Sequence, residues 1–359
     1  MPNQVVHIPC QNYPIKPSPG FDKKDLANYH LEIMGWCGYA CTYCSSPWGN
    51  YLRINREPFA DITEEQLGQR SYPSTNPDLT FQYPDFVEKL ELQLADIDKS
   101  FGKGLELVFS QLTDGFSPIV VGNGKTRYAL DRVLEKTSFT IRVMTKNAVV
   151  GTDRWIRYFL QHKDRFIIGL SIGTTNDDWQ PQVELGTSSP SARIKAINKL
   201  IDAGVRTYAM VCPVFPHVLQ DGMFEDLLDQ LNIPKLEHVW TEPYNDRANW
   251  ELVHKGLDDS HPDKEWLHKC YQEKKYYMWS DYASELYERI LKKAESEGWE
   301  DIFTYLLYEA HIDKKDVSRF GDLHGILLQT KKGGDGYSKH PDFRNLQLKL
   351  ETTGYKNAG

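Results

Sequence analysis

Short apolar segments alternate with amphipathic segments along residues 29–241, and this alternation limits the chain to few architectures. The apolar segments have the length and the β-branched and aromatic content of strands, and the segments between them repeat apolar residues with helical spacing. Strands are expected at residues 29–35, 104–110, 139–145, 166–172, 206–212 and 236–241. Helices are expected at residues 86–97, 128–137, 153–162, 190–203 and 222–231, and residues 45–80 are expected to be irregular.

The expected strands are apolar on both faces, which is typical of a parallel sheet covered by helices on its two sides. Strand and helix in alternation therefore predict an α/β fold with right-handed crossovers, either an open doubly wound sheet or a full or partial barrel. In both architectures the functional side chains gather where the strands end at their carboxyl edge. The loops after the strands are therefore the place to look for chemistry.

Two helices have clear end signals. Ser189 is a good N-cap before Pro190, and Gly204 follows the last apolar position. Beyond residue 245 the alternation stops, and a second helix is expected from an N-cap at Ser280 to Gly298. We expect an N-terminal extension at residues 1–27, a core at 28–245 and an α-rich C-terminal extension at 246–359 that covers the mouth of the core.

Composition excludes several classes of protein. The formal net charge is −8, whereas proteins that bind nucleic acid usually carry a basic face. No apolar run is long enough to cross a bilayer, and the first residues do not form a secretory signal, so we expect a cytoplasmic protein without a membrane partner. In a reducing compartment, closely spaced cysteines are metal ligands or catalytic groups rather than disulfides.

Three cysteines, Cys37, Cys41 and Cys44, follow the first expected strand in the stretch "GWCGYACTYC". A structural zinc site would need a fourth ligand, but the sequence offers neither a second C-x2-C pair nor a nearby histidine. Iron–sulfur clusters are held by thiolates, and three thiolates leave one iron of a 4Fe–4S cube without a protein ligand. Three cysteines are therefore compatible with a cluster that has one open iron.

The C-x3-C-x-aromatic-C form, with Tyr43 before the last cysteine, resembles the signature of the radical S-adenosylmethionine superfamily. The resemblance implies a 4Fe–4S cluster on Cys37, Cys41 and Cys44, with S-adenosylmethionine chelating the open iron. It also implies a partial (β/α)6 TIM-type barrel and reductive cleavage of the cofactor to a 5′-deoxyadenosyl radical, which abstracts hydrogen from a substrate. A reducing partner such as flavodoxin or ferredoxin is implied as well.

The likeness extends over about residues 28–245 and is greatest to the spore photoproduct lyase-like branch. The branch's strand-end patterns match "FSQLTDGFSP", "TKN", "LSIGTTNDD" and "VELGTSSPSAR". The resemblance thereby nominates cofactor-binding residues in addition to Tyr43: Ser110, Thr113, Asp114, Lys146, Ser171, Glu184 and Arg193. Each also has a structural alternative, because Ser110 and Ser171 could simply end strands and Glu184 with Arg193 could be a surface ion pair.

The chain also departs from that branch. The lyase carries a cysteine after its second strand that returns a hydrogen atom to the substrate, and "FSQLTD" has none. Cys212, at the end of the fifth expected strand, is the candidate for a radical role, although most buried free cysteines are small hydrophobic residues. The substrate-side candidates follow the sixth expected strand: Glu242, Tyr244, Asn245 and Arg247.

These features favour an enzyme that acts on a small metabolite or a peptide rather than on duplex DNA. Two alternatives stay open: a nucleic-acid-modifying or lyase-type enzyme related to spore photoproduct lyase, and a non-catalytic iron–sulfur protein.

The acidic composition predicts weak retention of the protein on immobilised duplex DNA at physiological salt. A duplex binder must neutralise several phosphates, so tight retention that falls steeply with added salt would contradict this expectation. Transfer of deuterium from labelled DNA into 5′-deoxyadenosine would contradict it as well.

Overall fold

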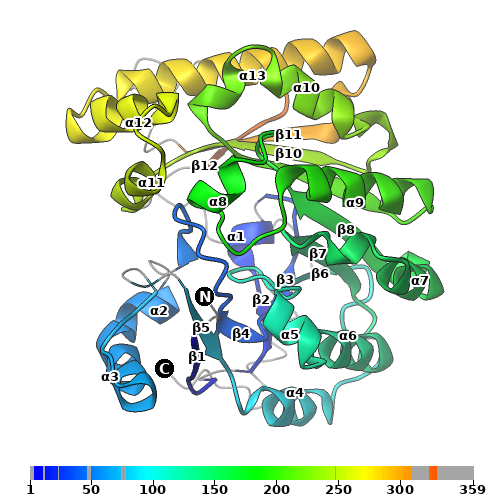
Figure 1. Ribbon diagram of the computed structural model, residues 1–359. Helices are drawn as coiled ribbons and strands as arrows, with labels where there is room; N and C mark the ends of the chain where they lie inside the picture. The colour runs from blue at the N-terminus through cyan, green and yellow to red at the C-terminus, as the bar shows by residue number, and fades with distance from the viewer. Residues whose placement is uncertain are drawn as a thin grey trace.

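The computed structural model describes most of the chain and shows a large mixed sheet with helices packed along it, beside a smaller three-stranded sheet (Figure 1). In the large sheet the strand order is β12-β11-β10-β9-β8-β7-β6-β3-β2. The described residues are 4–10, 13–22, 24–46, 50–73, 76, 78–246, 248–308 and 323–329.

The six expected strands all occur and lie in chain order within the large sheet, each parallel to the next. The expected parallel α/β fold is therefore confirmed. These strands are β3 (Tyr29–Leu31), β6 (Glu106–Phe109), β7 (Thr140–Thr145), β8 (Phe166–Ser171), β9 (Thr207–Val214) and β10 (Val239–Pro243).

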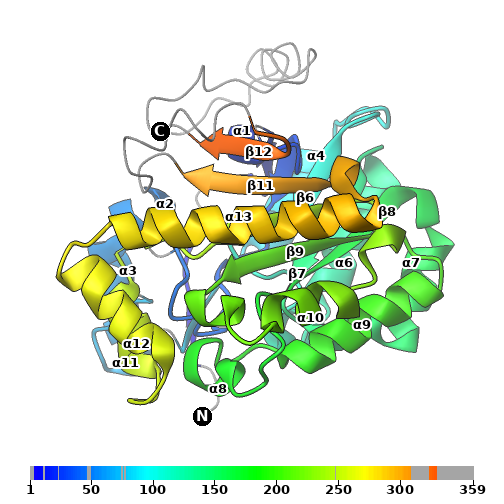
Figure 2. The same ribbon diagram turned by 90° about the horizontal axis from the view of Figure 1, so that it is seen from above.

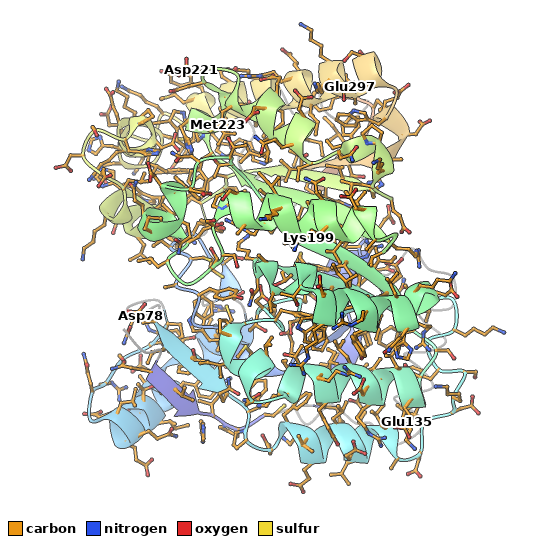
Figure 3. All side chains as sticks on the ribbon, turned by 45° about the vertical axis from the view of Figure 1, so that its right-hand side comes forward. Asp78, Glu135, Lys199, Asp221, Met223 and Glu297 are labelled. Atoms are coloured by element: carbon orange, nitrogen blue, oxygen red, sulfur yellow. The ribbon has the colours of Figure 1, made fainter. Side chains whose placement is uncertain are left out.

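The helices between these strands form a row along one side of the sheet, from α4 at the bottom of Figure 1 to α10 near the top. Figure 3 labels Lys199 of α9 and Met223 of α10 in this row. Ser189 caps α9 as expected, since its side chain accepts from the Ala192 amide. The row comprises α4 (Phe86–Leu94), α5 (Pro118–Gly122), α6 (Lys125–Lys136), α7 (Asp153–Gln161), α9 (Pro190–Asp202) and α10 (Met223–Gln230).

The sheet does not end at β10. β11 (Phe303–Tyr308) pairs parallel with β10, and β12 (Ile326–Gln329) pairs parallel with β11, beyond helix α13 in Figure 2. The C-terminal region, which we expected to be α-rich, thus also contributes strands, one of them from its apolar stretch "FTYLLY". At the other edge β2 (Ile15–Pro17) runs antiparallel to β3. Among the described residues no pairing joins β2 to β12, so the sheet is open.

The division of the chain at residue 245 stays a prediction, although the sheet itself continues across it. After that residue come α11 (Trp250–Gly256), α12 (Pro262–Leu267) and α13 (Tyr277–Glu297). Ser280 is not an N-cap, because α13 begins at Tyr277 and buries Ser280 within its first turns. Gly298 ends α13 in the left-handed conformation, as expected.

The stretch at residues 45–80, which we expected to be irregular, contains α2 (Asn50–Ile54), α3 (Arg56–Leu67) and the start of β5 (Leu79–Gln82). β5 pairs with β1 (Gln4–His7) and with β4 (Met34–Trp36) in the small sheet. The expected strand at residues 29–35 is therefore divided: β3 belongs to the large sheet and β4 to the small one. The cysteine loop starts directly after β4.

The large sheet has a second face, on the side away from the row of helices. Side chains fill this face below the carboxyl ends of the strands. The Arg142 guanidinium lies 4.8 Å from the ring centre of Tyr208 and 5.1 Å from that of Trp240, and it is paired with Glu106 at 2.6 Å. The indole of Trp240 donates to the Lys24 carbonyl at 3.1 Å, which holds the segment after α1 (Pro19–Asp22) against this face. No described helix is long and apolar enough to span a membrane.

Replacing Leu307 of β11 by Ala should test whether the C-terminal region is part of the folded core. Leu307 is fully buried, so the free energy of unfolding should fall by about 2–5 kcal/mol. Leu92→Ala on α4 is the control, because Leu92 is 59% exposed and its loss should cost less than about 1 kcal/mol. Equal effects of the two substitutions in urea denaturation would contradict the packing of β11.

Candidate functional site

A cavity of about 340 Å³ opens at the carboxyl edge of the large sheet. Its wall is built from the loops after β4, β6, β7, β8, β9 and β10, so it collects residues from distant parts of the sequence. The residues that the sequence predicted and that line this cavity are Cys37, Cys41, Tyr43, Cys44, Thr113, Asp114, Lys146, Ser171, Cys212, Glu242, Tyr244 and Asn245.

The cysteine loop is fixed by hydrogen bonds from both of its sides. Tyr39 O accepts from Gly186 N at 2.8 Å, and Thr42 N donates to Val183 O at 2.9 Å. A Cβ at Gly186 would lie 3.0 Å from the Tyr39 Cα, so the close approach of the two chains favours glycine there. From the other side the buried amide of Asn249 donates to Cys44 O at 3.1 Å.

The loop also needs left-handed backbone at Gly38 (φ 66°) and Ala40 (φ 52°). The non-glycine Ala40 pays a conformational cost of about 1 kcal/mol for this φ. These turns bring the three thiols to one cavity although they lie within eight consecutive residues.

At least two of the three thiol sulfurs lie more than 4.8 Å apart. Tetrahedral zinc bound by sulfur would place the sulfurs about 3.8 Å apart, given a Zn–S bond of about 2.3 Å. Among the described residues, sets of three ligand atoms that lie within 4.8 Å of one another include no cysteine. A multinuclear cluster, whose metal atoms occupy separate corners, fits wider spacing.

Burial raises the pKa of each of the three thiols. The ammonium of Lys146 opposes this rise for Cys41 and Cys44, because it favours the thiolate. The wall of the cavity thus offers a positive charge next to the groups that a metal cluster would need in the deprotonated form.

Lys146 follows β7, and its ammonium group contacts Ser171 at the end of the neighbouring strand β8. Lys146 Nζ donates to Ser171 Oγ, and Ser171 Oγ in turn donates to the Cys212 carbonyl at 2.8 Å. Lys146 Nζ also lies 5.7 Å from the ring centre of Tyr43. The predicted Lys146 and Ser171 are therefore neighbours and both face the cavity.

Glu184 and Arg193 are neither surface residues nor lining residues of the cavity. Their side chains are 3% and 1% exposed and form an ion pair behind the wall. Glu184 also accepts from the Tyr43 hydroxyl, and it lies 3.7 Å from Lys146 Nζ. Burial raises the pKa of Glu184, but the charges of Arg193 and Lys146 and two hydrogen bonds outweigh burial and hold the pKa below its usual value. The pair thus contacts Tyr43 and Lys146 through Glu184, and its part in cofactor binding stays a prediction.

Asp114 lines the cavity, yet its carboxylate is occupied by protein donors. It accepts from the Phe116 and Lys146 amides at 2.8 Å each and from the Thr145 hydroxyl at 2.8 Å. Burial is the largest influence on Asp114 and raises its pKa. The residue joins the loop after β6 to the end of β7, so it shapes the wall.

Ser110 does not line the cavity either, and Arg247 has no described position. Ser110 is fully buried with φ 64°. It ends β6, which is the structural alternative raised for it. Arg247 lies outside the described residues.

The substrate-side candidates form the wall after β10. Asn245 Nδ2 donates to Glu242 Oε1 at 2.8 Å, while the ring of Tyr244 stacks on Phe215 with centres 4.2 Å apart. Burial raises the pKa of the Cys212 thiol to about 11, and the charge of Glu242 adds to this rise, whereas Lys146, Ser171 and Lys24 oppose it. Cys212 is therefore a neutral thiol between charges of both signs.

Sequence reasoning missed three residues that hold the site together: Glu32, Asn249 and Lys24. Glu32 accepts from the Leu112 amide at 2.8 Å and from the Thr113 hydroxyl at 3.0 Å, and so fixes the loop after β6. An acidic residue inside an otherwise apolar strand was a signal that Glu32 accepts hydrogen bonds from neighbouring segments. Asn249 lies 205 residues from Cys44 along the chain, and neither Asn249 nor Lys24 had a signal in the sequence.

Comparisons with known proteins find distant likenesses. No family model matches the chain. An uncharacterized protein of Methanocaldococcus jannaschii is 21% identical over 264 residues, which are 72% of this chain and 85% of that protein. A spore photoproduct lyase structure with bound AdoMet and dinucleoside spore photoproduct is 16% identical and covers 71% of this chain and 68% of its own, with a TM-score of 0.42. The structure of anSMEcpe with bound AdoMet is 10% identical over 75% of this chain and 59% of its own, with a TM-score of 0.43.

Glu32→Gln should change how stability depends on pH. Burial raises the pKa of Glu32 from 4.5 to about 7. The folded chain therefore binds this proton more tightly than the unfolded chain, so the contribution to stability is present below pH 4.5 and is lost as the pH rises to about 7.

Urea unfolding of both proteins between pH 4 and pH 8 measures this difference. Relative to Glu32→Gln, the wild type should lose free energy of unfolding as the pH rises through that window. Glu88→Gln, an exposed substitution on α4, is the control and should run parallel to the wild type. A constant difference between wild type and Glu32→Gln at every pH would contradict the raised pKa.

Proposed function

We propose that this chain is a radical S-adenosylmethionine enzyme whose cavity holds a 4Fe–4S cluster on Cys37, Cys41 and Cys44. The observation that carries the proposal is the meeting of three thiols with Lys146 and Ser171 in one cavity at the carboxyl edge of a parallel sheet. Three thiolates leave one iron open for a ligand that is not a protein side chain.

The donor set fits such a cluster. The thiols are held in a loop that is hydrogen-bonded from both sides, which prepares the ligands before any metal binds. Cys212 also lines the cavity, but it belongs to β9 and its sulfur lies 3.9 Å from Ser171 Oγ, on the wall formed by the strand ends. We assign it to the substrate side and not to the cluster, with a radical role as hydrogen-atom donor.

The residues around the open side of the thiols suit an anionic and hydroxyl-rich ligand. Lys146 supplies a cation, a common point-charge partner of carboxylates. Ser171 and Thr113 supply hydroxyl groups on the same wall, and Tyr43 packs beside the last cysteine. We assign Lys146 to the carboxylate of S-adenosylmethionine and Ser171 to its ribose. When bound, the cluster and this cofactor would supply a 5′-deoxyadenosyl radical for hydrogen abstraction.

We further propose that the substrate is a small metabolite or a peptide. The sheet face below the cavity is filled by Arg142, Tyr208 and Trp240, so the space for a substrate is limited. Glu242, Tyr244 and Asn245 would contact the substrate from the wall after β10. A cytoplasmic location and a reducing partner such as flavodoxin or ferredoxin complete the proposal.

Alanine substitution of each cluster cysteine tests the ligand assignment. Protein reconstituted without oxygen should hold about four irons and four sulfides per chain. Cys37→Ala, Cys41→Ala and Cys44→Ala should each lose most of this iron, because each removes one of three thiolates. Cys212→Ala is the matched control and should keep its iron. Equal loss of iron from Cys212→Ala would contradict the assignment.

Lys146→Ala and Ser171→Ala test the cofactor wall. Both variants should keep their iron, while the affinity for S-adenosylmethionine measured by calorimetry should fall about 10- to 100-fold for Lys146→Ala, which removes a charged hydrogen bond of about 1.5–3 kcal/mol. Ser171→Ala should have a smaller effect. Lys195→Ala, at an exposed position of α9, is the control. Unchanged affinity in Lys146→Ala would show that the lysine does not reach the cofactor.

A further inference from the structure

A second group of chemically active side chains lies outside the cysteine cavity. His217 belongs to the 3-10 helix Pro216–Leu219 that follows β9, and His261 and Asp263 lie at the start of α12. None of the three lines the cysteine cavity. Through these residues the segment after β9 contacts the start of α12.

The three side chains lie close together. One ring nitrogen from each histidine and one oxygen of Asp263 lie within 4.8 Å of one another. The ring centres of the histidines are 4.8 Å apart, and the rings are inclined at 78°. Within the described residues no other set of three His, Cys, Asp or Glu side chains meets this spacing.

Asp263 already fixes the orientation of His217. Its carboxylate accepts from the His217 amide at 2.8 Å and from His217 Nδ1. A carboxylate that holds one imidazole nitrogen leaves the lone pair of the other available, which is the usual arrangement behind a metal-bound histidine. Asp263 is 1% exposed and retains further lone pairs on its two oxygens.

The second nitrogen of His217 has no hydrogen-bond partner in the described part of the chain. His217 is 5% exposed, and its Nε2 is buried. Leaving a buried polar atom unpaired costs about 1–3 kcal/mol, so such an atom calls for a ligand. This observation is independent of the spacing, and it makes Nε2 the ligand atom of His217, whereas Nδ1 on the other edge of the ring is held by Asp263.

An open cavity of about 510 Å³ gives access to the group. His261 lines this cavity together with His254, Asp259 and His268. An ion that enters this cavity would therefore meet His261 first and could reach the buried His217 beside it without passing the cysteines.

We propose that His217 and His261 bind one divalent transition-metal ion, with zinc as the ion that imidazole ligands suit, and that Asp263 orients His217 for it. Water from the open cavity completes its coordination. The ion fastens α12 to the segment after β9 and thereby supports the wall that carries Cys212. This site is separate from the proposed cluster and does not depend on it.

Metal analysis of the full chain tests this proposal. Protein grown with added zinc and purified without oxygen should contain about one zinc per chain that resists dialysis, in addition to any iron. X-ray absorption at the zinc edge should show nitrogen and oxygen ligands. Sulfur ligands would place the zinc on the cysteines and overturn the proposal, as would protein without zinc.

Substitutions separate the site from other surface histidines. His261→Ala and Asp263→Asn should lose the zinc and keep their iron, and zinc should no longer raise their melting temperature. His254→Ala is the matched control, because His254 lines the same open cavity but lies outside the group, and it should keep the zinc. His261 is half-buried, so its replacement tests the site even if Asp263→Asn does not fold. Loss of zinc from His254→Ala to the same extent as from His261→Ala would overturn the proposal.

Discussion

The site depends on the ion pair and hydrogen bond that the buried carboxylate of Glu184 forms. A charge that is 3% exposed must be paired, and Glu184 finds its partners on three different parts of the chain. Arg193 on α9 pairs with it and also donates to Ser171 O at 2.6 Å, Tyr43 donates from the cysteine loop, and Lys146 approaches from the end of β7. Removing Glu184 would leave the charge of Arg193 buried and unpaired, so the network requires all its members together. One carboxylate thus sets the relative positions of loop, lysine and serine.

Much of this arrangement could be predicted from the sequence, because parallel strands buried on both faces have an unmistakable apolar pattern. The six strands of the expected core and the cap at Ser189 were predicted on that basis. β11 was missed because "FTYLLY" follows a long helix without the earlier alternation, and α3 was missed because its sequence is mostly polar. Local pattern does not tell which sheet a short strand joins, so the separation of β4 from β3 needed tertiary structure.

The site divides in the same way. The resemblance of the cysteine motif and of the strand-end patterns to a known family brought Lys146, Ser171 and the three cysteines into one prediction, and the carboxyl ends of parallel strands meet at one edge. The hydrogen bonds of the buried carboxylates could not be predicted from the sequence, because they depend on which donors the fold brings to each carboxylate. Asp114 was expected as a cofactor contact, which stays a prediction, whereas its hydrogen bonds with Phe116, Thr145 and Lys146 were not foreseen. Asn249, about 200 residues from Cys44 along the chain, could be connected with the cysteine loop only through the fold.

The central claim is that the three thiols and Lys146 form one site for cluster and cofactor. The most direct measurement is the formation of 5′-deoxyadenosine when the reconstituted protein is mixed with S-adenosylmethionine and a strong reductant in the absence of oxygen. We predict that the wild-type protein forms it and that Cys44→Ala does not. If the wild type holds a complete, reducible cluster and binds S-adenosylmethionine yet forms no 5′-deoxyadenosine, the account is contradicted.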